Sequence, residues 1–337
     1  MHHRRDVEGK EAGRGRRENQ TGGRRARRYA RAGDADRILR VGVLRLEDFR
    51  AGFVALLGPP NAGKSSLLNT ILGQHLAIVS AKPQTTRSRI LGILPREGAQ
   101  ILFLDTPGRH ESPKQLNVAL NAVVAEVARD CEVALLLVDR AVGWTDVHEQ
   151  LAGALAGMSR PTIVVGTKSD LRRAQSNPWP LEEAPRGWPA FAVSARTEEG
   201  IEGLLEAIVE ALPLSPPLYG EDELTDRPMR WLCAEMVREA LFELLDRELP
   251  YSMAVEVLRY DESNAKAIRI EANLLVERDS QKRIVVGKGG RMIKKIGIRA
   301  RGAIEQWVGR QVHLQLFVKI DPSWLKNDRR ISQLGYH

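Results

Sequence analysis

The stretch from Gly58 to Ser65, with the sequence GPPNAGKS, constrains the fold more than any other part of the chain. It fits the pattern G-x-x-x-x-G-K-[ST], with an apolar strand-like run at residues 53–57 before it and a helix-like segment at residues 66–72 after it. A chance glycine-rich turn would lack this context. Glycines let the backbone wrap closely around an anion, and the N–H groups at a helix start then point at it. The stretch therefore predicts a phosphate-binding loop, in which Lys64 reaches the outer phosphates of a nucleotide.

Apolar runs alternate with helical patterns from residue 51 to residue 213. Those that follow the loop are residues 101–104, 133–138, 162–165 and 191–193. Runs this apolar are typical of strands buried on both faces of a mostly parallel sheet. Such α/β sheets bind ligands at the carboxyl ends of their strands. We therefore expect the residues that contact the nucleotide to lie at strand ends and in the loop itself. The predicted contacts in the loop are Gly58, Pro59, Asn61, Ala62, Gly63, Lys64, Ser65 and Ser66.

Two polar segments are the expected sites of the metal and of the terminal phosphate. Asp105 closes an apolar strand and can hold Mg²⁺ directly or through water, together with the Ser65 hydroxyl. Thr86, in the loop at residues 82–87, is expected to close over Mg²⁺, with Thr85 as the alternative. Gly108 would place a backbone N–H near the γ-phosphate. The nucleotide contacts predicted after this strand are Asp105, Thr106, Pro107 and Gly108.

The next two strand ends predict a guanine site. A carboxylate at Asp170 can accept hydrogen bonds from N1–H and N2–H of guanine, a donor pair that adenine lacks. Lys168 can lie along the base through its aliphatic stem, and the Ala195 N–H can donate to O6. Taken singly, such residues are usually surface residues. The predicted base contacts are Thr167, Lys168, Asp170, Ser194, Ala195 and Arg196.

The positive charge of the chain is concentrated at its two ends. The formal net charge is +8, but residues 1–50 hold 15 Lys and Arg against 8 Asp and Glu, and residues 280–337 hold 13 against 3. This distribution favours a nucleic-acid contact near the C-terminus. Residues 1–48 are predicted to be a basic, disordered arm, either an RNA-binding tail or the product of a start codon assigned too far upstream. No apolar run is long enough to span a membrane, no secretory signal is evident, and Cys131 and Cys233 are expected to be reduced core residues.

A second, smaller domain is expected after the nucleotide domain, which we assign to residues 49–213. Residues 214–228 contain prolines that cannot continue a helix, so they are predicted to be a linker. Residues 229–337 have the pattern helix, strand, strand, helix, helix, strand. The run Gly287-Lys288-Gly289-Gly290, between the two adjacent helices, resembles the G-x-x-G loop with which KH domains clamp single-stranded nucleic acid. This element order is that of prokaryote-type (type II) KH domains.

Around this loop we expect a basic groove with an apolar floor. Val286, Ile293 and Ile296 would form the floor, and Lys288 and Arg291 would supply charge. The predicted RNA contacts are Val286, Gly287, Lys288, Gly289, Gly290, Arg291, Ile293 and Lys294. The further basic residues Lys295, Arg299 and Arg301 are either phosphate contacts or a solvated helix face, and their density favours phosphate contact.

The motifs from Phe53 to the C-terminus resemble those of the Era family of translation-factor-like GTPases. The match rests on the Gly-x-Pro-Asn-x-Gly-Lys-Ser loop, the Gln-Thr-Thr-Arg segment at residues 84–87 and the Asp-Thr-Pro-Gly segment at residues 105–108. The resemblance implies a P-loop GTPase domain with a mostly parallel sheet, a C-terminal type II KH domain, and GTP or GDP with Mg²⁺ as ligands. It further implies binding to the 3′ end of 16S rRNA, a role in 30S subunit assembly, a cytoplasmic location with loose association to the inner membrane face, and no stable oligomer.

Two departures from the family pattern bear on the site. Thr167 stands where the base motif usually has Asn, which predicts somewhat lower guanine affinity. Arg109 stands where relatives carry an apolar residue, and neither supplies a water-orienting Gln, so we expect slow intrinsic hydrolysis that a partner raises. Asn61 matches the position that recruits potassium in cation-activated relatives, which implies dependence on K⁺.

Two other classes of protein compete with this interpretation. A tRNA-modification or ribosome-biogenesis GTPase of another subgroup is disfavoured by the C-terminal Gly-Lys-Gly-Gly segment. An RNA-binding protein with a degenerate nucleotide fold is disfavoured by the intact loop and by Asp105.

Overall fold

The computed structural model describes residues 48–79, 82, 89–105, 130–158, 160–246, 248–324 and 327–334. Contacts divide the chain into two units, residues 1–43 and residues 44–337, and every described residue belongs to the second. The predictions for Thr85, Thr86, Thr106, Pro107, Gly108 and Arg109 lie outside the described residues, as does the arm up to residue 47.

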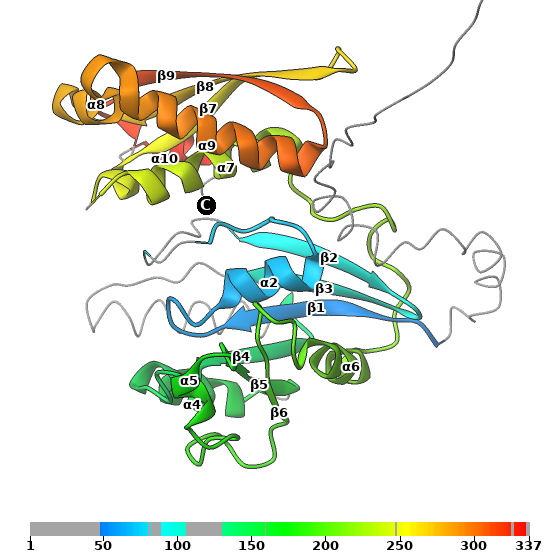
Figure 1. Cartoon of the computed structure of the whole chain (residues 1–337). Coiled ribbons are helices and arrows are strands. Elements are labelled where there is room, and N and C mark those ends of the chain that lie inside the picture. The colour runs from blue at the N-terminus through cyan, green and yellow to red at the C-terminus, as the bar shows by residue number, and fades with distance from the viewer. Residues whose placement is uncertain are drawn as a thin grey trace, which may run out of the picture. The chain divides into compact units, whose positions relative to one another are not determined.

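A six-stranded sheet with the order β2-β3-β1-β4-β5-β6 organises the first part of the described chain (Figure 1). Its strands are β1 (Arg50–Leu57), β2 (Ile90–Arg96), β3 (Ala99–Asp105), β4 (Val133–Asp139), β5 (Thr162–Thr167) and β6 (Ala190–Ala192). All neighbouring pairs are parallel except β2 and β3, which are antiparallel. The prediction of a mostly parallel α/β sheet is confirmed.

Helices cover both faces of this sheet. Alternate residues of a strand point to opposite faces, so Leu56 packs in one core cluster and Ala55 in another. The first cluster includes side chains of α2 (Lys64–Leu72) and α6 (Ile201–Ala211), and the second includes those of α4 (Asp146–Ala156). A short helix, α5 (Arg172–Gln175), follows β5. Burial on both faces explains why the strands have continuous apolar sequences.

The C-terminal part has the element order predicted for a type II KH domain. Three helices, α7 (Met229–Leu244), α8 (Asp279–Val286) and α9 (Arg291–Val308), share a core with the sheet β7-β8-β9. The strands are β7 (Ala254–Asp261), β8 (Ala267–Val276) and β9 (Gln311–Ile320), with β7 antiparallel and β9 parallel to β8. Single-turn 3₁₀ helices occupy Leu249–Ser252 and Lys288–Gly290.

The opposite face of this small sheet has a cover that the sequence pattern did not predict. Trp324, only 2% exposed, packs with Ala254, Leu275 and Leu334. Leu334 follows directly after α10 (Asp328–Gln333). The last segment is therefore part of the packed domain at this end of the sheet. Among the helices in the described ranges, none combines the length and the apolar character needed to cross a bilayer.

Candidate nucleotide pocket and nucleic-acid interface

The phosphate loop joins β1 to α2 in a conformation that requires its glycines. Gly58 has φ 145°, and a Cβ at this position would lie 2.6 Å from the backbone carbonyl oxygen of Leu137. Gly63, with φ 91°, stands directly before the first residue of α2, which is Lys64. The first N–H groups of a helix have no acceptor within the helix, so the start of α2, directly after the loop, suits an anion.

Lys64 is buried and held by the loop that it closes. Its Nζ donates to the carbonyl oxygen of Gly58 at 2.8 Å and to that of Pro59 at 3.0 Å. Burial lowers the pKa of Lys64, and the negative charge of Asp105 partly offsets this effect. The ammonium group is thus fixed at the mouth of the loop, where it needs little reorganisation to meet a phosphate.

Two oxygen donors that suit a hard cation meet next to Lys64. The Ser65 hydroxyl, at the start of α2, donates to Oδ2 of Asp105 at 2.9 Å. Asp105 is the last residue of β3 and is fully buried. A hydroxyl and a carboxylate are the kind of protein ligand that Mg²⁺ takes beside phosphate oxygens, so this pair fits the metal.

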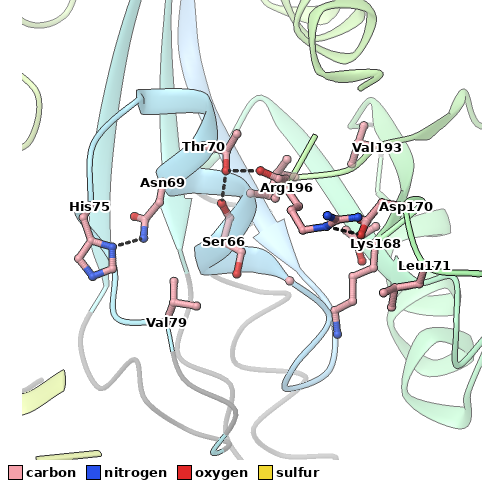
Figure 2. Close-up of a pocket in the computed structure, with 14 residues that line it drawn as sticks. Ser66, Asn69, Thr70, His75, Val79, Lys168, Asp170, Leu171, Val193 and Arg196 are labelled. Carbon is pink, nitrogen blue, oxygen red and sulfur yellow. Dashed lines mark hydrogen bonds and ion pairs between the residues drawn. The ribbon is translucent and has the colours of Figure 1, made fainter. Parts of the chain in front are cut away.

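A cavity of about 550 Å³ opens beside the loop, among α2 and the ends of β5 and β6 (Figure 2). Five of the six base contacts predicted from sequence line it, together with apolar walls from Leu171 and Val193, whereas Ser194 is buried behind Asp170. Its lining is Gly63, Ser66, Leu67, Asn69, Thr70, His75, Val79, Thr167, Lys168, Asp170, Leu171, Val193, Ala195 and Arg196.

Asp170 presents both carboxylate oxygens to polar partners. The Ser194 hydroxyl donates to Oδ1 at 2.7 Å. Nε of Arg196 donates to Oδ2 at 2.7 Å (Figure 2). The hydrogen bond from Ser194 and then that from Arg196 hold the pKa of Asp170 below its usual value. The carboxylate is therefore ionised at neutral pH and acts only as an acceptor, which suits a base edge with two N–H donors.

Thr167 is turned toward the protein. Its hydroxyl lies 2.7 Å from the carbonyl oxygen of Ala62 and 3.2 Å from that of Val138, and the residue is 3% exposed. It thereby ties the phosphate loop to the end of β5. This is a structural contact that the sequence pattern alone did not identify.

Lys168 is oriented by a carboxylate that the sequence analysis missed. Its Nζ donates to the Asn61 carbonyl oxygen at 2.8 Å and to Oδ2 of Asp139 at 2.7 Å. Asp139 is the last residue of β4, just as Asp105 is the last residue of β3. An acidic residue that closes a buried apolar run is the signal that could have identified it.

The loop after β6 is held by Thr70, another residue that the sequence analysis did not select. The Thr70 hydroxyl donates to the Ala195 carbonyl oxygen at 2.9 Å and also lies 3.0 Å from the Ser66 carbonyl oxygen (Figure 2). Within the described part of the chain, the Ala195 N–H has no protein acceptor. This N–H remains available to an acceptor on a bound ligand.

The Gly-Lys-Gly-Gly loop connects α8 to α9 in the C-terminal domain. Gly287 has φ 71°, and a Cβ there would lie 2.7 Å from the Cβ of Met292. Lys288, Gly289, Arg291 and Lys294 are exposed, whereas Val286 and Ile293 are half-buried. The loop is therefore an open, positively charged corner above two partly covered apolar side chains.

Two predictions for the surroundings of this loop need correction. Ile296 is fully buried in the domain core, so it does not line a groove floor. Arg299 donates to both carboxylate oxygens of Glu243, at 2.6 and 2.7 Å. The hydrogen bond to Glu243 raises the pKa of Arg299, and the guanidinium is paired with a carboxylate in this structure instead of forming a bare solvated cation.

Comparisons with known proteins agree with this geometry. A family model described as a 50S ribosome-binding GTPase matches residues 53–168, and a KH domain model matches residues 248–325. GTPase Era of Nitratidesulfovibrio vulgaris strain DP4 is 41% identical over 297 residues, covering 85% of this chain and 96% of that protein. The chain belongs to the Era family of GTPases. GTPase Era of Lacticaseibacillus paracasei strain ATCC 334 is 38% identical over 298 residues, covering 87% of this chain and 98% of that protein.

Solved Era structures also resemble the chain along most of its length. Era in complex with MgGDPNP and nucleotides 1506–1542 of 16S ribosomal RNA has a TM-score of 0.73 and 33% identity, and the match covers 86% of this chain and 99% of that one. An Aquifex aeolicus Era variant bound to GDP·AlF4⁻ has a TM-score of 0.74 and 35% identity, with the same coverage. As an Era-family member, the chain is a GTPase with a KH RNA-binding domain.

Proposed function

We propose that this Era-family GTPase binds the 3′ end of 16S rRNA through its KH domain under the control of GTP, and that it acts in assembly of the 30S subunit. The single observation that carries the nucleotide half of the proposal is the cavity beside the phosphate loop, where Asp170, Lys168 and the Ala195 N–H converge. The RNA half draws support from the solved Era complex with an rRNA fragment and from the open Gly-Lys-Gly-Gly loop.

In the proposed guanine site, Asp170 accepts from N1–H and N2–H while the Ala195 N–H donates to O6. The aliphatic stem of Lys168 lies along the base, and Asp139 and the Asn61 carbonyl fix its ammonium end. Ser194 supports Asp170, so that the carboxylate keeps its orientation when Arg196 leaves it. The carboxylate rejects adenine because adenine sets the N1 lone pair against it and has no pair of N–H donors there.

At the phosphate end, Lys64 and the N–H groups at the start of α2 would receive the β- and γ-phosphates. Mg²⁺, when bound, would neutralise charge that develops on the phosphate oxygens. Ser65 and Thr86 would hold it directly and Asp105 mainly through a water molecule. The contacts assigned to Thr86, Thr106, Pro107 and Gly108 are proposals from sequence, as are slow intrinsic hydrolysis and the recruitment of K⁺ by Asn61.

For RNA binding we propose that the glycines of residues 287–290 bring the backbone close to the strand. Lys288, Arg291 and Lys294 would contact phosphates, and Val286 and Ile293 would contact bases. We retain the boundaries 1–48, 49–213, 214–228 and 229–337 for the arm, GTPase domain, linker and KH domain. Peripheral association with the cytoplasmic membrane face and the absence of a stable oligomer remain proposals that the resemblance alone supports.

The decisive experiment compares GTP, ATP and XTP binding to the full chain and to Asp170→Asn. The side-chain N–H of the new asparagine would face the N2–H donor of guanine, which is unfavourable. In xanthine the same position carries a carbonyl oxygen, which can accept from this N–H. We expect the variant to lose at least about 100-fold in GTP affinity and to prefer XTP. Asp222→Asn, an exposed change in the linker, is the matched control. A wild-type protein that binds ATP as tightly as GTP would refute the guanine site.

The RNA half is tested with a single-stranded oligonucleotide of the 16S 3′ end. We expect binding that depends on whether GTP or GDP is present, and GTP hydrolysis that rises when the oligonucleotide is added. Equal binding to an unrelated single strand, with no change in hydrolysis, would contradict the assignment to rRNA.

A further inference from the structure

Thr167 directs the only hydrogen-bond donor of its side chain into the protein. A threonine hydroxyl carries one proton, and here it faces the carbonyl oxygens of Ala62, at 2.7 Å, and Val138, at 3.2 Å. The hydroxyl proton is therefore shared between two backbone acceptors, and Thr167 is only 3% exposed. The hydroxyl therefore has no second proton to offer to a ligand in the cavity.

An asparagine at the same strand end would differ in its number of donors. A primary amide has two N–H donors, so one can hold the loop carbonyl while the other points outward. Thr167 can hold the loop carbonyl but has no second donor that points outward. An acceptor atom of the base near position 167 therefore receives no hydrogen bond from this side chain.

The proposed orientation of guanine indicates which atom this is. With N1–H and N2–H on Asp170 and O6 on the Ala195 N–H, the adjacent acceptor on the same edge is N7. The phosphate loop and the end of β5 are close together, because a Cβ on Gly63 would lie 3.5 Å from the Thr167 side chain. In the proposed orientation the five-membered ring of guanine, which carries both N7 and the bond to the ribose, would be turned toward the phosphate loop. The Thr167 hydroxyl would then be near N7 without a proton to donate to it.

Two other side-chain donors that line the cavity, those of Lys168 and Thr70, are already engaged. The ammonium of Lys168 is bonded to Asp139 and to the Asn61 carbonyl, and the Thr70 hydroxyl is bonded to backbone carbonyls. We propose that this chain selects guanine through N1, N2 and O6 and that position 167, within the described residues, gives N7 no donor, because Thr167 commits its hydroxyl to the phosphate loop. The inference rests on the guanine site proposed above.

The test is calorimetric titration of the full chain with GDP and with 7-deaza-GDP, in which a C–H group replaces N7. We expect the two dissociation constants to agree within about twofold. A neutral hydrogen bond contributes about fivefold to an affinity, so a loss of fivefold or more on removal of N7 would overturn the inference. Titration with ADP tests the guanine site separately. If ADP binds as tightly as GDP, the proposed guanine site is wrong, whatever the comparison of GDP with 7-deaza-GDP shows.

Variants at position 167 identify the cause. Thr167→Asn restores a second donor, so 7-deaza-GDP should now bind about fivefold more weakly than GDP. Thr167→Val removes the tether to Ala62 and should weaken both nucleotides by the same factor, leaving their ratio near one. Thr162→Val, at the opposite end of the same strand, is the matched control and should change neither affinity. If Thr167→Asn remains insensitive to N7, position 167 does not face that atom and the inference is wrong.

Discussion

The two glycine-rich loops of the chain have similar residues in opposite settings. In the phosphate loop, Lys64 is 8% exposed and its ammonium is fixed 2.8 Å from a carbonyl oxygen of its own loop. In the loop at residues 287–290, Lys288 is exposed, and within the described residues its ammonium has no protein partner. Each loop precedes a helix and contains glycines at positive φ.

This difference separates a site for one small ligand from a site for a polymer. A nucleotide phosphate has a fixed geometry, and pre-organised donors in a dry pocket stabilise its charge with little reorganisation. A single strand of RNA presents phosphates in varied positions, which a flexible, solvated lysine can follow. The glycine pattern alone does not distinguish the two, whereas the burial of the lysine does.

The largest expected effect is that of Lys64→Ala. Loss of the fixed ammonium should lower kcat/KM for GTP hydrolysis by about 10²–10³, as for other pre-organised donors of a developing charge. Binding of nucleotide-free protein to single-stranded RNA should stay within about twofold. Phosphate release and fluorescence anisotropy measure the two activities, and Lys266→Ala, in the exposed turn between β7 and β8, controls for the lost charge. Normal hydrolysis by Lys64→Ala would break the comparison on the nucleotide side.

A pair of glycine substitutions sharpens the contrast in backbone packing. Gly58→Ala would place a Cβ 2.6 Å from the Leu137 carbonyl oxygen, whereas Gly289→Ala meets no atom within 4 Å and bears only the strain of φ 60°. We expect a loss of about 3 kcal/mol in unfolding free energy for Gly58→Ala and about 1 kcal/mol for Gly289→Ala.

Hydrogen exchange of amides in β1 and in β8, measured in urea, reports the stability of each domain separately. Each variant should affect the strand of its own domain and leave the other near the wild-type value. Equal losses in both variants would mean that the phosphate loop relaxes around the added methyl group.

A smaller effect is expected at the exposed lysine. Lys288→Ala should weaken binding of single-stranded RNA several-fold and lower the slope of log affinity against log salt by about 0.7, the value for one phosphate contact on a single strand. GTP affinity should not change. Titrations at several salt concentrations test this, with Lys266→Ala as the matched control, and an unchanged salt slope would remove Lys288 from the interface.

Sequence reasoning identified the fold and the strand-end residues for a physical reason. Continuous apolar strands and their polar ends follow from burial on both faces of the sheet, so Asp105, Thr167 and Asp170 could be assigned to one edge. The antiparallel pairing of β2, the packing of Trp324 and the pairing of Arg299 with Glu243 depend on tertiary contacts that leave no periodic signal. The direction of the Thr167 hydroxyl depends likewise on the loop above it.

The smallest expected effect concerns His148, a buried group on the phosphate-loop side. Its Nδ1 accepts from the Thr145 N–H at 3.0 Å, so Nε2 carries the proton and donates to the Leu137 carbonyl oxygen at 3.1 Å. Burial, and to a lesser degree the charge of Lys64, lowers the pKa of His148, although the bond to Leu137 opposes this shift. The Thr145 hydroxyl also lies 2.8 Å from Nδ1, and the backbone donor at this nitrogen is consistent with a neutral ring in the folded protein.

The sign of the pH dependence follows from this shift. Because the folded pKa lies below the unfolded value of 6.5, the unfolded state takes up a proton first as the pH falls. The stability from the neutral ring is complete above pH 6.5 and is lost below it, with a slope of at most about 1.4 kcal/mol per pH unit for one proton. Urea unfolding between pH 5 and 7.5 should show this slope in the wild type and a flatter profile in His148→Gln. An unchanged slope in His148→Gln would show that another group causes the pH dependence.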